Sequence, residues 1–158
     1  MKSPWICALR SVSLTVPDLA AAEVFYTQTW GLQVAAKDAG VLYLKGSGAD
    51  HHLLALSEAE GTPQIRWVTL RARSLSALND IAQATVAAGG TVERTGAALD
   101  PAGGSVLLIR DPDGRRLEIV YGDAQVPELS PVPPDQPVRL AHAVLNSHAV
   151  EETRVFFE

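Results

Sequence analysis

The sequence predicts an α+β fold assembled from repeated βαβββ modules, and three observations lead to this prediction. A strand followed by a helix opens the chain, the same opening returns twice further along, and only strand patterns lie between the openings. A repeat of this length indicates supersecondary units that pack side by side.

The first opening is an alternating strand at residues 9–16 followed by a helix from about residue 18. Asp18 suits the N-cap because its carboxylate can accept from the first free amides, and Gly31 can end the helix. Residues 140–145 and 149–158 repeat this strand and helix at one constant offset without a gap. A weaker copy places a strand at 65–72 and a helix at 74–88.

The remaining segments favour strands. Module one continues with strands at 32–36, 41–44 and 52–56, and module two continues with strands at 91–95, 105–109 and 116–121. Asp111-Pro112-Asp113-Gly114 is a turn by its chemistry, since proline presets φ and glycine accepts positive φ.

The predicted organisation is a module pair over residues 1–122, with modules at 8–57 and 64–122. A proline-rich linker over 123–137 follows, and residues 138–158 begin a third module that stops in its helix. We therefore expect the chain to be part of a longer protein, truncated early in a second domain. An unpaired strand at 138–145 would be an exposed edge, which makes a homo-oligomer our expectation.

Composition excludes several classes of protein. Hydrophobic residues make up 47% and charged residues 20% of the 158 residues, as in ordinary globular domains. The net charge of −5 with scattered basic residues argues against nucleic-acid binding, and no apolar stretch suits a membrane span or a signal peptide. The single cysteine, Cys7, fits a reducing cytoplasm, and we expect it to be a buried, unreactive thiol.

A family resemblance rests on two motifs in this modular context. Val16-Pro17-Asp18-Leu19 joins strand to helix, and Asp111-Pro112-Asp113-Gly114 precedes Glu118 on the closing strand. With these motifs the chain resembles the vicinal oxygen chelate superfamily of glyoxalases, bleomycin-resistance proteins, epimerases and type I extradiol dioxygenases. The resemblance implies that each module pair curls into an open, cup-shaped mixed sheet with helices outside.

The linker and third module start resemble the dioxygenases, which have four modules in two domains and carry Fe(II) only in the C-terminal cup. This implies the non-catalytic N-terminal domain of a ring-cleaving enzyme that acts on a catechol-type aromatic. Two alternatives stay open. One is a metal-free ligand-binding or resistance protein, with a cup lined by Trp67, Leu14 and Tyr43. The other is a glyoxalase- or epimerase-like metalloenzyme.

The family's iron ligands correspond here to Ser11, Trp67 and Glu118, and only the last of these suits Fe(II). We therefore expect this cup to hold no metal. Glu118 is either the vestige of a metal site pointing into the cup or an ordinary strand carboxylate, paired with Arg115 or Arg116 or facing water, and we favour the second. Arg66 and Arg71, beside Trp67, are expected to be solvated.

Three histidines complete the set of candidates. His52, or His51 one residue earlier, holds the place of a second-shell acid/base of the dioxygenases but in the wrong domain, so a surface or edge histidine is the preferred interpretation. His142 falls where the first strand of module three would supply an iron ligand. The resemblance makes it a ligand in the intact protein only, because the remaining ligands would lie beyond residue 158.

Overall fold

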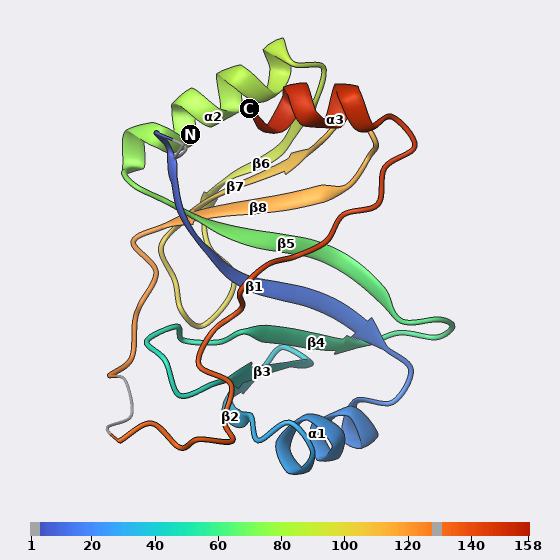
Figure 1. Ribbon diagram of the computed structural model, residues 1–158, viewed down its shortest axis with the longest axis vertical. Helices are drawn as coiled ribbons and strands as arrows, with labels where there is room; N and C mark the ends of the chain where they lie inside the picture. The colour runs from blue at the N-terminus through green and yellow to red at the C-terminus, as the bar shows by residue number, and fades with distance from the viewer. Residues whose placement is uncertain (1–3, 128–130) are drawn as a thin grey trace.

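The computed structural model describes residues 4–127 and 131–158. Within them the chain forms eight strands and three helices (Figure 1): β1 (Ile6–Val16), α1 (Leu19–Gln28), β2 (Gln33–Asp38), β3 (Val41–Lys45), β4 (Leu54–Glu58), β5 (Gln64–Ala72), α2 (Leu75–Ala87), β6 (Thr91–Ala97), β7 (Ser105–Arg110), β8 (Arg116–Tyr121) and α3 (Val150–Phe157). The α+β class and the two βαβββ modules are confirmed.

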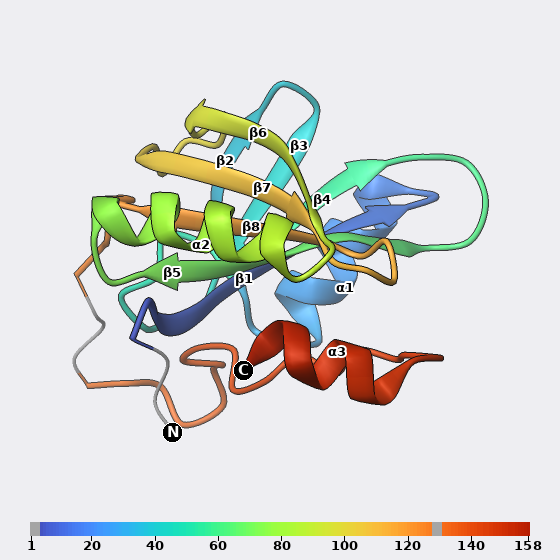
Figure 2. The same cartoon turned by 90° about the horizontal axis from the view of Figure 1, so that it is seen from above.

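All eight strands join one mixed sheet in the order β2-β3-β4-β1-β5-β8-β7-β6. In each module the last strand returns to lie parallel to the first, β4 beside β1 and β8 beside β5. The antiparallel pair β1–β5 joins the modules at the centre of the sheet. Figure 2 shows both ends of the sheet rising on the same side of this central pair, which gives the sheet a concave and a convex face.

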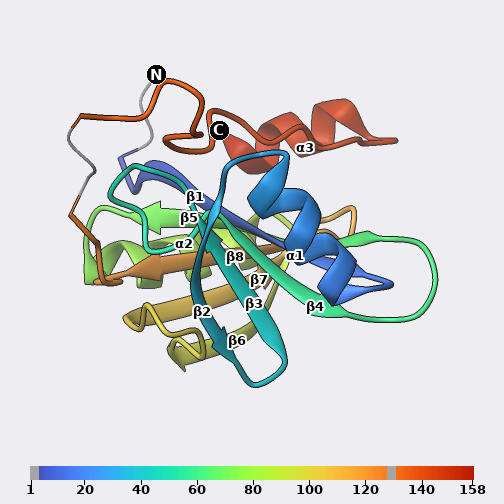
Figure 3. The same cartoon turned by 90° about the horizontal axis from the view of Figure 1, so that it is seen from below.

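The convex face carries two apolar cores, one per module. The first packs leucines of β3 and β4 against Leu19, Ala22 and Tyr26 of α1, and the second packs β5, β7 and β8 against α2. Figure 3 shows α1 lying across the strands of its own module. The Asp18 carboxylate accepts from Ala21 N at 2.8 Å, which confirms the predicted N-cap.

The central pair β1–β5 contains three β-bulges, because each register shift leaves one residue without a partner across the pair. The unmatched residues are Cys7 and Arg10 on β1 and Arg66 on β5. A bulge re-aims the side chains around the extra residue. Cys7 is accordingly exposed, so the predicted burial of this thiol is wrong.

The predicted strand at 140–145 is also wrong. This segment is extended but pairs with no strand, and it crosses the convex side towards α3 (Figures 1 and 2). The residues just before it are anchored by hydrogen bonds from Ser47 N to Pro137 O (2.9 Å) and from Gly48 N to Val138 O (3.1 Å). A Cβ on Gly46 would overlap the Pro137 carbonyl oxygen, so glycine is needed for this approach. The segment therefore adds no strand to the sheet.

The predicted helix at 149–158 is confirmed by α3, whose Phe156 packs against the core under α2. Part of the predicted linker, residues 128–130, lies outside the described residues. No helix in the described ranges is long and apolar enough to cross a membrane.

Candidate functional site

The concave face holds the candidate site, a cavity of about 290 Å³. Strand register places its floor in two rows. Tyr43, Ala55, Ser13 and Trp67 follow one another across β3, β4, β1 and β5. Ser11, Thr69, Glu118, Leu108 and Arg94 form the second row across β1, β5, β8, β7 and β6. Both modules therefore contribute to one cup.

The bulges add two arginines to this cup. Arg10 and Arg66 are the unmatched residues of their strands, and each lines the cavity together with the residue that follows it, Ser11 or Trp67. In a regular strand, neighbouring side chains would point to opposite faces. The bulges thus explain how two consecutive side chains reach the same cavity.

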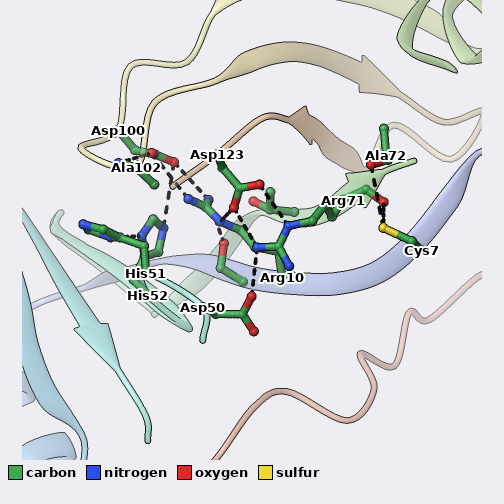
Figure 4. A network of polar contacts seen from close by, with 12 residues as sticks. Cys7, Arg10, Asp50, His51, His52, Arg71, Ala72, Asp100, Ala102 and Asp123 are labelled. Carbon is green, nitrogen blue, oxygen red and sulfur yellow. Dashed lines mark hydrogen bonds and ion pairs between the residues drawn. The ribbon is translucent and has the colours of Figure 1, made fainter. Parts of the chain in front are cut away.

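Arg10 is fully buried and lies at the centre of a polar network (Figure 4). Its Nη1 lies 3.0 Å from Asp100 Oδ2, and its Nε lies 3.3 Å from Asp123 Oδ2. Arg71 extends the network, with Nη2 at 2.7 Å from Asp123 Oδ2 and 2.8 Å from Asp50 Oδ1. Burial alone would raise the pKa of Asp123, but the hydrogen bonds from Arg71 together with the charges of Arg71 and Arg10 outweigh it and lower that pKa. Arg71 is therefore an ion-pairing residue, and the expectation of a solvated side chain is wrong.

His52 belongs to the same network and not to the surface. Its side chain is almost fully buried, its ring lies against Tyr43 and its Nε2 is 3.9 Å from Asp100 Oδ2. Burial, reinforced by the charge of Arg10, lowers the pKa of His52 to about 2. The preferred interpretation of a surface or edge histidine is wrong, because β4 begins only at Leu54 and His52 turns inward before it.

Glu118 points into the cup, as the vestige interpretation required. It is 9% exposed, lines the cavity and accepts a hydrogen bond from Thr69 Oγ1 at 3.1 Å. Burial, with the nearby charge of Asp100, raises its pKa. The predicted partners lie elsewhere, since Arg115 pairs with Asp111 and Arg116 pairs with Glu93.

Of the three residues predicted to line the cup, Trp67 and Tyr43 do so. Leu14 does not. Its side chain packs against the apolar core under α1, because it alternates with Ser11 and Ser13, which face the cup, and so points to the convex side. Burial, with the charge of Asp100, raises the pKa of Tyr43.

The floor does not fit an iron site. The residues level with one another on the three strands are Ser11, Thr69 and Glu118, so Thr69 takes the position that the sequence assigned to Trp67. Two hydroxyls and one carboxylate lack the imidazoles of a non-haem Fe(II) site. In the part of the chain that the structure describes, no three His, Cys, Asp or Glu side chains gather into a metal-binding group. His142 is exposed on the segment before α3, far along the chain from this floor.

Comparison with known proteins identifies the family. Residues 8–119 match the model of the Glyoxalase/Bleomycin resistance protein/Dioxygenase superfamily, and the chain belongs to this superfamily. None of the curated proteins compared with the chain matches it significantly.

Solved structures share its fold. The Mn(II)-bound glyoxalase from Novosphingobium aromaticivorans is similar with a TM-score of 0.86 and 29% identity, over 97% of this chain and 52% of that one. A variant of homoprotocatechuate 2,3-dioxygenase from Brevibacterium fuscum gives a TM-score of 0.85 and 25% identity, over 96% and 43%. A complex of homoprotocatechuate 2,3-dioxygenase from Brevibacterium fuscum with 3,4-dihydroxyphenylacetate gives a TM-score of 0.78 and 25% identity, over 87% of this chain and 44% of that one. The chain spans about half the length of these structures.

The sequence missed Arg10, Asp100 and Asp123 as members of the site. Asp100 and Asp123 lie in loops after β6 and β8, where no pattern fixes their direction. One signal was available: Arg10 is a charged residue in the middle of a strand that is otherwise apolar or small.

Proposed function

We propose that this chain is the N-terminal, non-catalytic domain of a two-domain extradiol-type dioxygenase whose Fe(II) and catechol-type substrate are held by the other domain. The observation that carries the proposal is the floor of the cup, where Ser11 and Thr69 stand beside Glu118 in place of nitrogen ligands. The similarity to the dioxygenase supports the proposal, because nearly all of this chain aligns with less than half of the dioxygenase chain.

In this proposal the cup supports the fold and performs no redox step. Glu118 is held by Thr69, and the Arg10 network ties the loop before β7 and the segment after β8 to the central strands. A buried network of this kind fixes backbone segments in one arrangement. His142 is proposed as an iron ligand of the intact protein, once the segment that carries it packs with a further module.

The experiment compares this chain with a longer version of the protein that includes the sequence after Glu158. Both are loaded with Fe(II) under anaerobic conditions, and metal content and catechol ring cleavage are measured. We expect no stoichiometric iron and no ring-opened product from this chain, and both from the longer protein. In the longer protein, His142→Ala should abolish iron binding, while Glu118→Gln should leave it unchanged. Cleavage by this chain, or loss of iron on Glu118→Gln, would refute the proposal.

The second candidate is half of a metal-dependent glyoxalase, favoured by the 29% identity to the Mn(II)-bound enzyme. The same longer protein distinguishes the two. Isomerisation of a glutathione hemithioacetal without ring cleavage would favour the glyoxalase.

A further inference from the structure

The cup has a feature that a purely supporting domain does not require, namely two guanidinium groups that form no salt bridge within the described residues. Three arginines line it, and Arg10 is neutralised by Asp100 and Asp123. Arg66 instead donates to the Ser57 hydroxyl at 3.2 Å, and Arg94 donates to the Ala97 carbonyl at 2.9 Å. Within the described residues neither forms a salt bridge, so both keep N–H donors for an anion, and Arg94 interacts with the Glu118 carboxylate only through its charge.

Arg66 is also aligned with an aromatic ring. Its guanidinium carbon lies 4.4 Å from the ring centroid of Trp67, an arrangement that holds the planar group flat while its remaining N–H donors stay open. This side chain reaches the cup because it is the extra residue of a bulge. Guanidinium donors held in a plane match the two oxygens of a carboxylate.

The other walls suit a ring. Trp67 and Tyr43 stand at the two ends of one floor row, with the small residues Ser13 and Ala55 between them. The volume of about 290 Å³ lies at the lower limit of small-molecule sites, which favours a single ring over a fused system. Beyond this row, Glu118 offers a carboxylate oxygen that can accept from a hydroxyl group.

We propose that the cup binds a small, single-ring aromatic carboxylate without any metal ion. The ring packs between Trp67 and Tyr43, the carboxylate of the ligand pairs with Arg66, with Arg94 adding positive charge, and a ring hydroxyl donates to Glu118. The cup then acts as a second ligand site, separate from the catalysis assigned to the other domain.

The probe is 4-hydroxybenzoate, titrated by calorimetry into this chain in buffer that contains EDTA. We expect binding at least about tenfold tighter than that of 4-hydroxybenzamide, which keeps the ring but lacks the charge. Binding should also be tighter than that of 4-hydroxycyclohexanecarboxylate, which keeps the charge but lacks the aromatic ring. Equal affinity for the acid and the amide, or no binding of the acid at millimolar concentration, would overturn the proposal.

Variants then test the residues. Arg66→Gln is expected to weaken 4-hydroxybenzoate about tenfold or more and to leave the amide unchanged, while Trp67→Leu weakens both. The matched control is Arg154→Gln, which removes the same charge from the exposed surface of α3 and should not alter binding. Arg66→Lys keeps the charge but loses the planar guanidinium group, so it should bind 4-hydroxybenzoate less tightly than the parent. It tests the role of Arg66 if Arg66→Gln fails to fold. Unchanged acid binding in both Arg66 variants would refute the role of Arg66.

The outcome is independent of the proposed function. EDTA removes any metal, and no turnover is measured. Binding in EDTA together with ring cleavage by this chain would keep the ligand site and refute the division of labour between domains. If this chain is iron-free, cleaves no ring and does not bind 4-hydroxybenzoate, the division of labour stands and the ligand site is refuted.

Discussion

The two faces of the sheet are formed by the same strands but bury different kinds of side chain. On the convex face Leu42, Leu44 and Leu56 are almost completely buried, whereas on the concave face Arg10, Ser11 and Thr69 are equally inaccessible. Burying leucine stabilises the fold, while burying a charge is costly unless it is paired. The difference shows that the convex face supplies stability and the concave face retains groups that stability alone would not select.

The largest expected effect concerns the convex face. Leu56→Ala should lower the free energy of unfolding by about 4 kcal/mol, because Leu56 is fully buried between Leu14 and Leu42. The measurement is urea denaturation. Leu108→Ala, the same change on the partly exposed cup floor, is the control and should cost less than half as much. Equal losses would remove the distinction between the faces.

The next largest effect concerns the charged network of the concave face. Arg10→Met should cost about 3 kcal/mol, because Asp100 loses its guanidinium partner while Asp123 keeps Arg71. Arg94→Met lies on the same face but breaks no ion pair, and we expect a change within about 0.5 kcal/mol. An Arg10→Met protein as stable as the parent would show that the ion pairs of Arg10 contribute nothing to the free energy of unfolding.

The third prediction concerns His52 and pH. Its pKa is about 2 in the folded chain against an ordinary value of 6.5, so below pH 6.5 the unfolded chain binds the extra proton. Stability should therefore fall as the pH drops, by about 2 kcal/mol between pH 6.5 and 5 for this group. His52→Gln should remove this component, and His148→Gln at an exposed site should not. The same pH profile in the parent and the His52→Gln protein would contradict the assignment.

The smallest effect has the opposite sign. Because burial raises the folded-state pKa of Glu118, its contribution is most favourable below its ordinary pKa and is lost as the pH rises through the folded value. Glu118→Gln keeps an acceptor for Thr69 and does not titrate. Its free energy of unfolding should therefore rise relative to that of the parent as the pH increases from 4.5 to 7. A stability difference that does not vary with pH in thermal melts would show that Glu118 is not desolvated.

The repeat predicted the strands and helices of both modules because periodicity is a local property of the chain. It failed at residues 140–145, where an alternating pattern pairs with no strand and Leu140 and Leu145 pack instead against the two cores. Pairing is a tertiary condition that no local pattern can report.

The candidate site was harder to predict than the fold. Trp67 and Tyr43 line the cavity as expected, but the positions of Arg66 and Cys7 depend on bulges that leave no sequence signature here. The convex position of Leu14, in contrast, follows from its alternation with Ser11 along the same strand. His52 could not be placed because a residue just before a strand is not bound by the alternation of that strand. Burial of Arg71 follows from Asp50 and Asp123, which are distant in sequence.

The bulge at Arg10 has a consequence for how such a cup can change during evolution. Removing or adding one residue in β1 would exchange the faces reached by every side chain beyond that point, up to the next irregularity. A cup could thus gain or lose a whole set of ligands through a single-codon deletion, with no substitution at the ligand positions themselves. Alignments that count only substitutions would miss such a change. In β1, a single extra residue is the difference between a regular strand and the strand that brings Arg10 and Ser11 into the same cup.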